Sequence, residues 1–237
     1  MAVEVIAHRG ASGTCPENTL PAFRRAVDLG APMIELDVQL TRDGHPVVIH
    51  DRTLDRTTSG RGAVRRRTLA EITKLDAGRW FSPAFAGARV PTLAEVLAEV
   101  PIRINVELKA AGDDGLERRV LEVVEGAAAL DRVIFSSFDW ASLERLRALT
   151  SGADLAVLWA GRSAGRALAC AHRVRARSVH LRKSGTAPAG IAAGHAAGLA
   201  VRLWTVNAPA DFARLTELGA DGLFTDYPER FLQNSHA

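Results

Sequence analysis

The sequence predicts a TIM-type (β/α)₈ barrel, an α/β fold, in one domain spanning residues 1–237. A length of 237 residues suits a single-domain barrel. Short apolar runs alternate with segments of helical spacing, as in barrels and doubly wound sheets. The barrel is favoured over an open sheet because no G-x-G-x-x-G motif follows the first run. The predicted strands are Val3–Ala7, Met33–Val38, Ile102–Leu108, Arg132–Ser136, Leu155–Trp159, Ser178–Leu181, Ala200–Val206 and Gly222–Thr225.

Composition excludes several classes of protein. The net charge is only +3, and the Arg-rich stretches carry no interleaved aromatic residues, so we expect no nucleic-acid partner. Two cysteines, Cys15 and Cys170, do not make a disulfide framework. No apolar run approaches the roughly 18 residues of a membrane span, and the N-terminus does not resemble a secretory signal. We therefore expect a cytoplasmic protein without stable membrane anchoring.

One segment interrupts the alternation of strands and helices. The link Gln39–His45 is too short to connect parallel strands, so Met33–Val38 and Pro46–His50 are predicted to form a hairpin. A turn centred on Asp43-Gly44 would pair Leu40 with Val47 and Asp37 with His50. The next residues, about 52–90, are predicted to form a small insertion that caps the barrel mouth.

Polar side chains gather where the predicted strands end, which is where the active sites of these barrels lie. Glu35 and Asp37 lie two apart on one strand, and Asn105, Glu107 and Lys109 share one face of the next. Buried carboxylates are costly unless they are paired or bind a cation. Converging Glu35, Asp37 and Glu107 side chains therefore predict an oxygen-ligand site for Mg²⁺ or Ca²⁺, with buried ion pairs as the alternative.

Cationic and titratable side chains complete the candidate site. Lys109 is one of only three lysines in a chain whose other cations are arginines. A lysine at this strand end therefore favours a compact positive charge in the site over an ordinary surface residue. His8 and His50 are candidates for a general acid–base pair, and Arg9 for an anion clamp. These residues favour cleavage of a phosphodiester somewhat over metal-assisted carbon–carbon chemistry. His180 is left open between a structural and a functional role.

The motifs resemble the glycerophosphodiester phosphodiesterase family over essentially the whole chain. The matching segments are HRGASGTCPENTLPAF, GAPMIELDVQLTRDGHPVVIHDRTLDRTTSGRG, NVELK, SSF, LWTVN and DGLFTDYP. The resemblance implies a TIM barrel with an insertion after the hairpin. It also implies a cation-dependent enzyme that converts deacylated phospholipids to sn-glycerol 3-phosphate and an alcohol. The glycerol 2-hydroxyl would attack phosphorus and form a cyclic phosphate that water then opens.

The resemblance also implies a role for each matching residue. Glu35, Asp37 and Glu107 would bind one divalent cation, Mg²⁺ or Ca²⁺ with Mn²⁺ as an alternative, and His8 and His50 would be the acid–base pair. Arg9 and Lys109 would bind the phosphate, and Trp204 would form an apolar wall unless it is an ordinary core residue. Supporting positions around the site are Asn18, Asp51 and Asp226. Asn18, beside Glu17, is also expected to cap the helix that carries Phe23 and Val27.

Two other functions stay open. The first is a phosphodiesterase for an acylated lipid, of lysophospholipase D or phospholipase C type. Trp80, Phe81 and Phe85 in the insertion would suit a lipid, although they could equally pack the insertion onto the barrel. The second is a non-catalytic phosphodiester-binding protein. Neither the leaving alcohol, the metal, the histidine that acts first as base nor the oligomeric state follows from the sequence.

Overall fold

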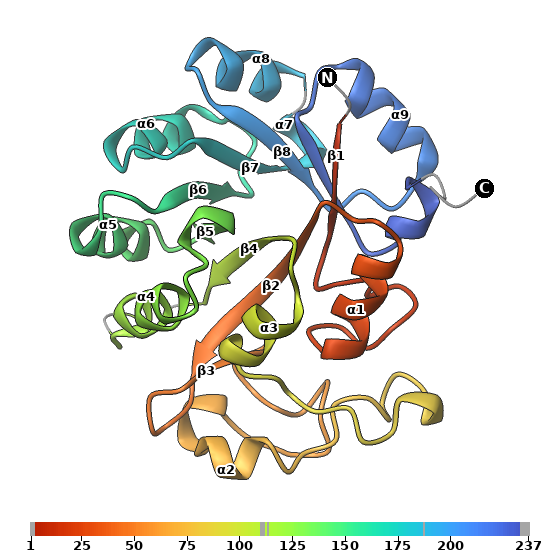
Figure 1. Cartoon of the computed structure of the whole chain (residues 1–237). Coiled ribbons are helices and arrows are strands. Elements are labelled where there is room, and N and C mark those ends of the chain that lie inside the picture. Colours follow the sequence, from red (N-terminus) through yellow and green to blue (C-terminus); the bar gives the residue numbers. More distant parts are fainter. Residues whose placement is uncertain (1–2, 110–111, 113, 187, 233–237) are drawn as a thin grey trace.

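The computed structural model describes residues 3–109, 112, 114–186 and 188–232 and confirms the closed barrel (Figure 1). Eight parallel strands follow one another in chain order, and β1 pairs with both β2 and β9, which closes the sheet. Every strand end lies within two residues of its predicted position. The strands are β1 (Glu4–Ala7), β2 (Met33–Leu40), β4 (Arg103–Leu108), β5 (Val133–Ser137), β6 (Asp154–Trp159), β7 (Ser178–Arg182), β8 (Ala200–Trp204) and β9 (Gly222–Thr225).

Helices surround the barrel, and most of the apolar core lies between them and the sheet. Phe23 from the first helix and Phe135 from β5 are among the largest fully buried side chains of this layer. The helices are α1 (Leu20–Asp28), α3 (Leu93–Glu99), α4 (Leu116–Gly126), α5 (Trp140–Leu149), α6 (Gly165–Arg173), the short α7 (Lys183–Thr186), α8 (Ala189–Ala196) and α9 (Pro209–Glu217). Among the described residues, no helix is long and apolar enough to cross a bilayer.

The alternation of side chains along β2 explains why carboxylates enter the barrel. Successive strand residues point to opposite faces of a sheet. Ile34, Leu36 and Val38 pack in the layer beneath the helices. Glu35 and Asp37 therefore face the barrel interior, where both are buried.

The predicted hairpin is present, but its register is shifted by one residue. Strand β3 (Pro46–Val48) pairs with β2 so that Leu40 faces Pro46 rather than Val47, and the Asp37 carbonyl accepts a hydrogen bond from Ile49 N–H. The reason is the turn. Thr41 N–H donates to the carbonyl of His45, which leaves a three-residue loop that ends at Gly44 with φ +79°. Such loops place glycine in the left-handed region.

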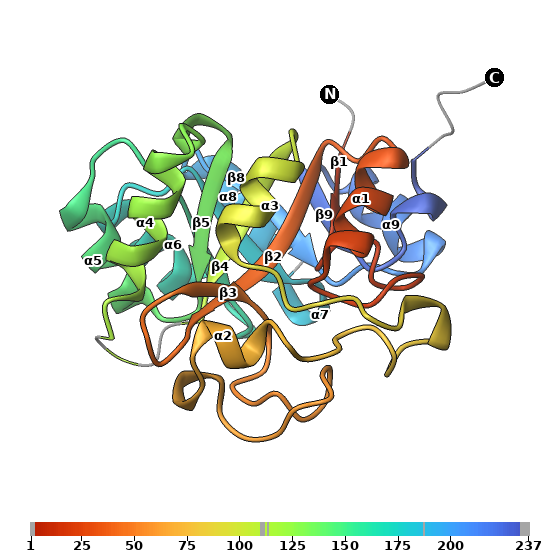
Figure 2. The ribbon, with the colours of Figure 1, turned by 60° about the horizontal axis from the view of Figure 1, so that its bottom comes forward.

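The insertion forms its own small lobe beside β2 and β3 (Figure 2). It contains the short helices η1 (Val64–Arg66), α2 (Leu69–Ile72) and η2 (Pro83–Phe85). Its apolar core packs Leu54, Val64 and Ile72 against Val47 and Ile49 of the hairpin. Because Arg52 and Thr53 line the outer part of the mouth, the predicted cap is better described as one side wall.

Candidate active site

Three buried carboxylates meet inside the carboxyl-terminal half of the barrel. Glu35 and Asp37 lie on β2, and the strand register places Glu107 of β4 opposite Asp37. One oxygen from each residue lies within 4.8 Å of the others, and the three residues are at most 9% exposed. The structure thus brings together the predicted cation ligands.

If all three carboxylates were ionised, they would hold more negative charge than their neighbours offset. Burial, together with the nearby Asp37 and Glu107, raises the pKa of Glu35 well above its usual value. Burial and the charge of Asp37 likewise raise the pKa of Glu107 to about 7, against the attraction of Lys109. Asp37 differs because Lys109, Arg9 and His50 outweigh its burial and lower its pKa. A bound cation would relieve this repulsion, so the residues present fit a hard divalent ion.

Arg9 and Lys109 both lie beside the buried carboxylates. Lys109 Nζ is 3.0 Å from Asp37 Oδ1 and also contacts Glu107 Oε1. Arg9 Nε lies 3.3 Å from Asp37 Oδ2, while the Arg9 backbone N–H donates to Glu35 Oε2 over 2.9 Å. The backbone of Arg9 is left-handed, with φ +56°, which directs both groups to the site. The structure therefore places Arg9 and Lys109 beside the carboxylates, and phosphate binding by them stays a prediction.

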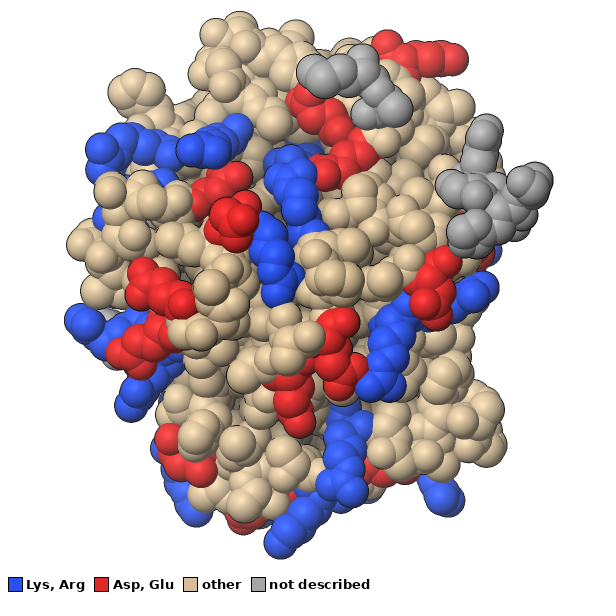
Figure 3. All heavy atoms as spheres, viewed as in Figure 1, with Lys and Arg blue, Asp and Glu red and all other residues tan. Residues whose placement is uncertain are grey.

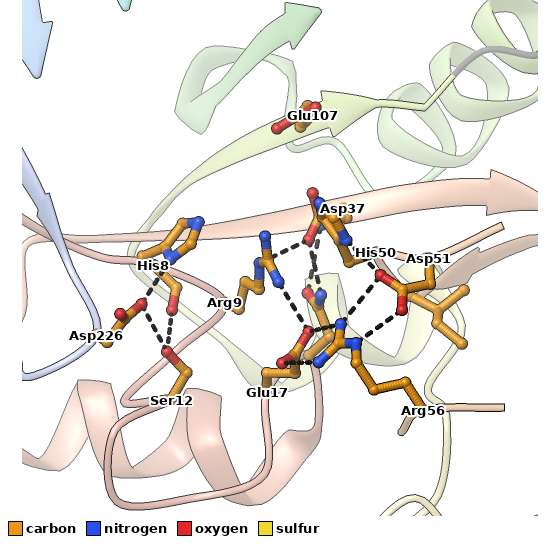
Figure 4. Close-up of polar contacts among 12 residues, drawn as sticks. His8, Arg9, Ser12, Glu17, Asp37, His50, Asp51, Arg56, Glu107 and Asp226 are labelled. Atoms are coloured by element: carbon orange, nitrogen blue, oxygen red, sulfur yellow. Dashed lines mark hydrogen bonds and ion pairs between the residues drawn. The ribbon is translucent and has the colours of Figure 1, made fainter. Parts of the chain in front are cut away.

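Each of the two predicted catalytic histidines is held by a carboxylate. His8 Nδ1 lies 2.6 Å from Asp226 Oδ1, and His50 Nδ1 lies 2.6 Å from Asp51 Oδ1. Figure 4 shows the two pairs at opposite ends of the site, with Arg9 between them. In both pairs the Nδ1 contact leaves Nε2 as the nitrogen available for proton transfer. Asp51 and Asp226 are thus in direct contact with the two histidines, and the supporting role predicted for them stays a prediction.

Asp226 and Gln39 add further support for the histidines. Burial would raise the pKa of Asp226, but its contacts with His8, Asn207 and Ser12 outweigh burial and lower the pKa to about 2. Asp226 is thus ionised at neutral pH and favours a proton on His8 Nδ1. On the other side, Gln39 Nε2 lies 2.7–3.1 Å from the carbonyl oxygens of residues 49–51 and fixes the segment that carries His50.

Asn18 has a different structural role from the predicted one. The N-cap of α1 is Thr19, and no side chain makes a capping hydrogen bond there. Asn18 instead takes up a left-handed conformation, with φ +57°, and turns toward the carboxylates. Its Nδ2 donates to Asp37 Oδ2 over 2.8 Å, and its Oδ1 accepts from Asp37 N–H over 3.3 Å. The predicted helix cap is therefore wrong, and Asn18 orients Asp37.

Arg56 is a member of the site that the sequence interpretation missed. It reaches from the insertion to two carboxylates at once. It donates to Glu17 Oε2 and Oε1 over 2.7 and 2.8 Å, and to Asp51 Oδ2 and Oδ1 over 2.7 and 3.1 Å. The hydrogen bonds from Arg56 lower the pKa of Asp51, and His50 acts in the same direction. No motif indicated this role, because the contact joins segments 39 positions apart.

Two cavities meet at the site. The inner one, about 140 Å³, lies among both histidines, Arg9, Lys109 and an apolar wall that includes Trp204, Leu158 and Phe224. The outer one, about 600 Å³, is lined on one side by residues 50–53 and on the other by Phe138 and Asp139. His50, Glu107, Lys109 and Phe138 line both cavities. Trp204 is thus part of the predicted apolar wall.

His180 does not line either cavity. It is fully buried inside the barrel, against Phe224 at 5.0 Å between ring centroids, and its Nε2 lies 3.3 Å from Ser178 Oγ. Burial, reinforced by Arg202, lowers the pKa of His180 well below its usual value, so it is neutral. The geometry favours the structural role that the sequence left open.

Comparisons with known proteins agree with this geometry. Residues 8–230 match the model of the glycerophosphoryl diester phosphodiesterase family. A glycerophosphodiester phosphodiesterase from Caldanaerobacter subterraneus is 40% identical, and the match covers 96% of each chain. One from Bacillus altitudinis is 37% identical over 96% of each chain.

The chain belongs to the glycerophosphoryl diester phosphodiesterase family. The predicted family and enzyme class are confirmed. A solved structure from Oleispira antarctica, 32% identical with a TM-score of 0.89, covers 96% of this chain and 94% of its own. That structure is of a phosphodiesterase in complex with its product sn-glycerol 3-phosphate.

The contacts of Arg56 generate a stability prediction. Arg56→Ala leaves Glu17, whose side chain is only 13% exposed, with Arg9 as its remaining cation. We expect the free energy of unfolding to fall by about 1–3 kcal/mol, since partly buried charges are costly to leave unpaired. Urea denaturation followed by circular dichroism measures this change.

Arg24→Ala is the matched control for Arg56→Ala. Arg24 also joins two distant segments through its pair with Glu99, but those side chains are 58% and 35% exposed. Its loss is expected to cost less than about 1 kcal/mol. Equal costs for the two variants would contradict the claim that Arg56 fastens the insertion to the site.

Proposed function

We propose that this chain hydrolyses glycerophosphodiesters to sn-glycerol 3-phosphate and an alcohol in a reaction that depends on one divalent cation. The observation that carries the proposal is the position of the two histidine–carboxylate pairs. Both histidines line one cavity that also contains Arg9, Lys109, Glu35 and Glu107. Family membership and the product bound to the Oleispira antarctica relative support the same substrate class.

Glu35, Asp37 and Glu107 would hold the cation, which we propose to be Mg²⁺ or Ca²⁺, with Mn²⁺ as an alternative. When bound, the cation supplies Lewis-acid polarisation of a non-bridging phosphate oxygen. Arg9 and Lys109 would balance the remaining phosphate charge. Asn18 would keep the Asp37 carboxylate turned inward through its two hydrogen bonds.

The cavities distinguish the two histidines. His8 lines only the inner cavity, whose small volume and apolar wall suit the glycerol carbons, whereas His50 also lines the outer one. In phosphoryl transfer the attacking and leaving oxygens lie roughly in line on opposite sides of phosphorus. The glycerol 2-hydroxyl would therefore attack from the side of His8, and the alcohol would leave on the side of His50.

Each histidine then has a defined proton transfer. His8 Nε2 would remove the proton of the 2-hydroxyl, and Asp226 would stabilise the imidazolium that results. His50 Nε2 would protonate the departing alcohol, with Asp51 holding its Nδ1. For the cyclic phosphate formed in this step, the roles reverse: His50 activates water and His8 returns its proton to the 2-oxygen.

The direct test is product identification with chelator-treated protein. Mg²⁺, Mn²⁺ and Ca²⁺ are added back separately with glycerophosphocholine, glycerophosphoethanolamine or lysophosphatidylcholine as substrate. We expect glycerol 3-phosphate from the first two substrates and only after a metal is added. Phosphocholine as product would mean that the other P–O bond is cleaved. Absence of turnover with every metal would leave the phosphodiester-binding protein as the better interpretation.

Turnover of lysophosphatidylcholine alone would favour the acylated-lipid alternative. Of the aromatic residues suggested for a lipid, Trp80 is 41% exposed, and Trp80, Phe81 and Phe85 pack edge to face on one another at 5.7 and 5.8 Å. None of the three lines either cavity of the site. The soluble glycerophosphodiesters therefore remain the proposed substrates.

A substrate with a good leaving group tests the two proton transfers. With glycerophosphocholine, His8→Ala and His50→Ala are each expected to lower kcat by about 10²–10⁴-fold. With the 4-nitrophenyl ester of glycerol 3-phosphate, 4-nitrophenolate leaves without a proton. His50→Ala should then lower kcat for its release by less than about ten-fold, while His8→Ala keeps its full effect.

His45→Ala controls for the loss of an imidazole, because His45 is 54% exposed in the hairpin turn. It should leave kcat unchanged with both substrates. The reverse pattern, in which the nitrophenyl ester rescues His8→Ala and not His50→Ala, would show that the two roles are exchanged. Near-normal activity of both variants with glycerophosphocholine would refute the assignment of the pair.

A further inference from the structure

A groove continues from the leaving-group side of the site along the insertion. The outer cavity of the site and a neighbouring cavity of about 410 Å³ share Arg52, Thr53 and Lys109 as lining residues. The neighbouring cavity extends past Gln39 to Ala63 and Arg65. An alcohol that leaves through the outer cavity therefore passes Arg52 and then approaches Arg65.

Backbone pairing within the insertion brings these two arginines to the same groove. Thr53 and Ala63 form an antiparallel bridge, and Val64 N–H donates to the carbonyl of Arg52 over 3.0 Å. Arg52 is thus hydrogen-bonded to Val64, the residue directly before Arg65. Because the apolar core of the insertion includes Leu54 and Val64, this pairing rests on buried side chains.

The two guanidinium groups are available to a ligand. Arg52 and Arg65 are both exposed, and neither forms an ion pair or a side-chain hydrogen bond with a described residue. Of the aspartates that line the groove, Asp51 and Asp139 have arginine partners and Asp114 does not. Asp51 is held by Arg56, Asp139 lies 3.4 Å from Arg145, and Asp114 accepts a hydrogen bond from Leu116 N–H. Two guanidinium groups without an ion pair thus line the groove with one carboxylate, Asp114, that has no cationic partner among the described residues, which leaves the groove with net positive charge.

The insertion accounts for the net positive charge of the protein. Residues 52–90 contain nine Lys and Arg residues and three Asp and Glu residues, whereas the other residues contain 21 and 24. Figure 3 shows Lys and Arg side chains along the lower edge of the molecule, where Figure 1 places the insertion. A substrate with a second anionic group would be drawn toward this side of the mouth.

We propose that Arg52 and Arg65 bind a second phosphate on the leaving alcohol, so that the enzyme prefers glycerophosphodiesters whose alcohol carries another phosphate group. This inference rests on the proposed function, in which the alcohol leaves through the outer cavity. Guanidinium groups match phosphate oxygens in geometry and charge, and two of them can bind one phosphate from adjacent positions. Thr53 lines the same cavity and would offer a hydroxyl to the same ligand.

The test compares glycerophosphoglycerol with bis(glycerophospho)glycerol, which carries a second phosphodiester on the leaving alcohol. The readout is a ratio of two specificity constants. It divides kcat/KM for bis(glycerophospho)glycerol, per scissile bond, by kcat/KM for glycerophosphoglycerol. For the metal-loaded wild-type protein we expect a ratio above about three that falls as salt screens the exposed charges. Arg52→Ala and Arg65→Ala are each expected to lower the ratio by about three- to ten-fold.

Arg66→Ala is the matched control, since Arg66 is exposed and adjacent to Arg65 but does not line the groove. It should leave the ratio unchanged. Turnover of glycerophosphoglycerol with a ratio near one, or a ratio unchanged in the Arg52 and Arg65 variants, would overturn this inference and leave the proposed function intact. Equal losses in all three variants would assign the effect to overall charge and also overturn it. Absence of turnover with either substrate would overturn both proposals.

Discussion

The arrangement of this protein depends on three carboxylates buried in one barrel interior. Burying an unpaired charge costs several kcal/mol, so the surrounding chain must supply positive charge or hydrogen bonds. Lys109 and Arg9 both approach Asp37, whereas Glu35 receives one backbone N–H, and Glu107 shares the Lys109 ammonium. With all three carboxylates ionised, the local charge balance is negative, and this imbalance fits the proposed cation site better than a set of balanced ion pairs.

The same requirement explains the surrounding connections. The loop after β1 brings Arg9 and Asn18 to Asp37 in left-handed conformations, which cost energy and are offset by the contacts they make. The insertion reaches back through Arg56 to fix Glu17 and Asp51. Segments from both ends of the chain, including Asp226, thereby hold the two histidines at opposite ends of the site, where both line the inner cavity.

Features that depend on the periodicity of side chains were predicted correctly from the sequence. Features that depend on one backbone dihedral angle were not. Alternation along β2 located Glu35 and Asp37, and strand ends located Glu107 and both histidines. The hairpin register was one residue off because Gly44 closes a three-residue loop instead of a two-residue turn. Asn18 was misassigned because its φ of +57° turns the side chain inward, away from helix α1. Arg56 could not be found, since its partners become neighbours only in the folded chain.

Calorimetric titration of the chelator-treated protein with Mg²⁺, Mn²⁺ and Ca²⁺ tests the central claim without requiring turnover. We expect one ion per chain, and Glu107→Gln should weaken its binding by at least about ten-fold, since even residues outside the ligand set cost that much. Glu99→Gln, which alters an exposed carboxylate paired with Arg24, should bind as tightly as wild type. Absence of binding by any of the three ions, or undiminished affinity in a folded Glu107→Gln protein, would contradict a cation site built from these carboxylates.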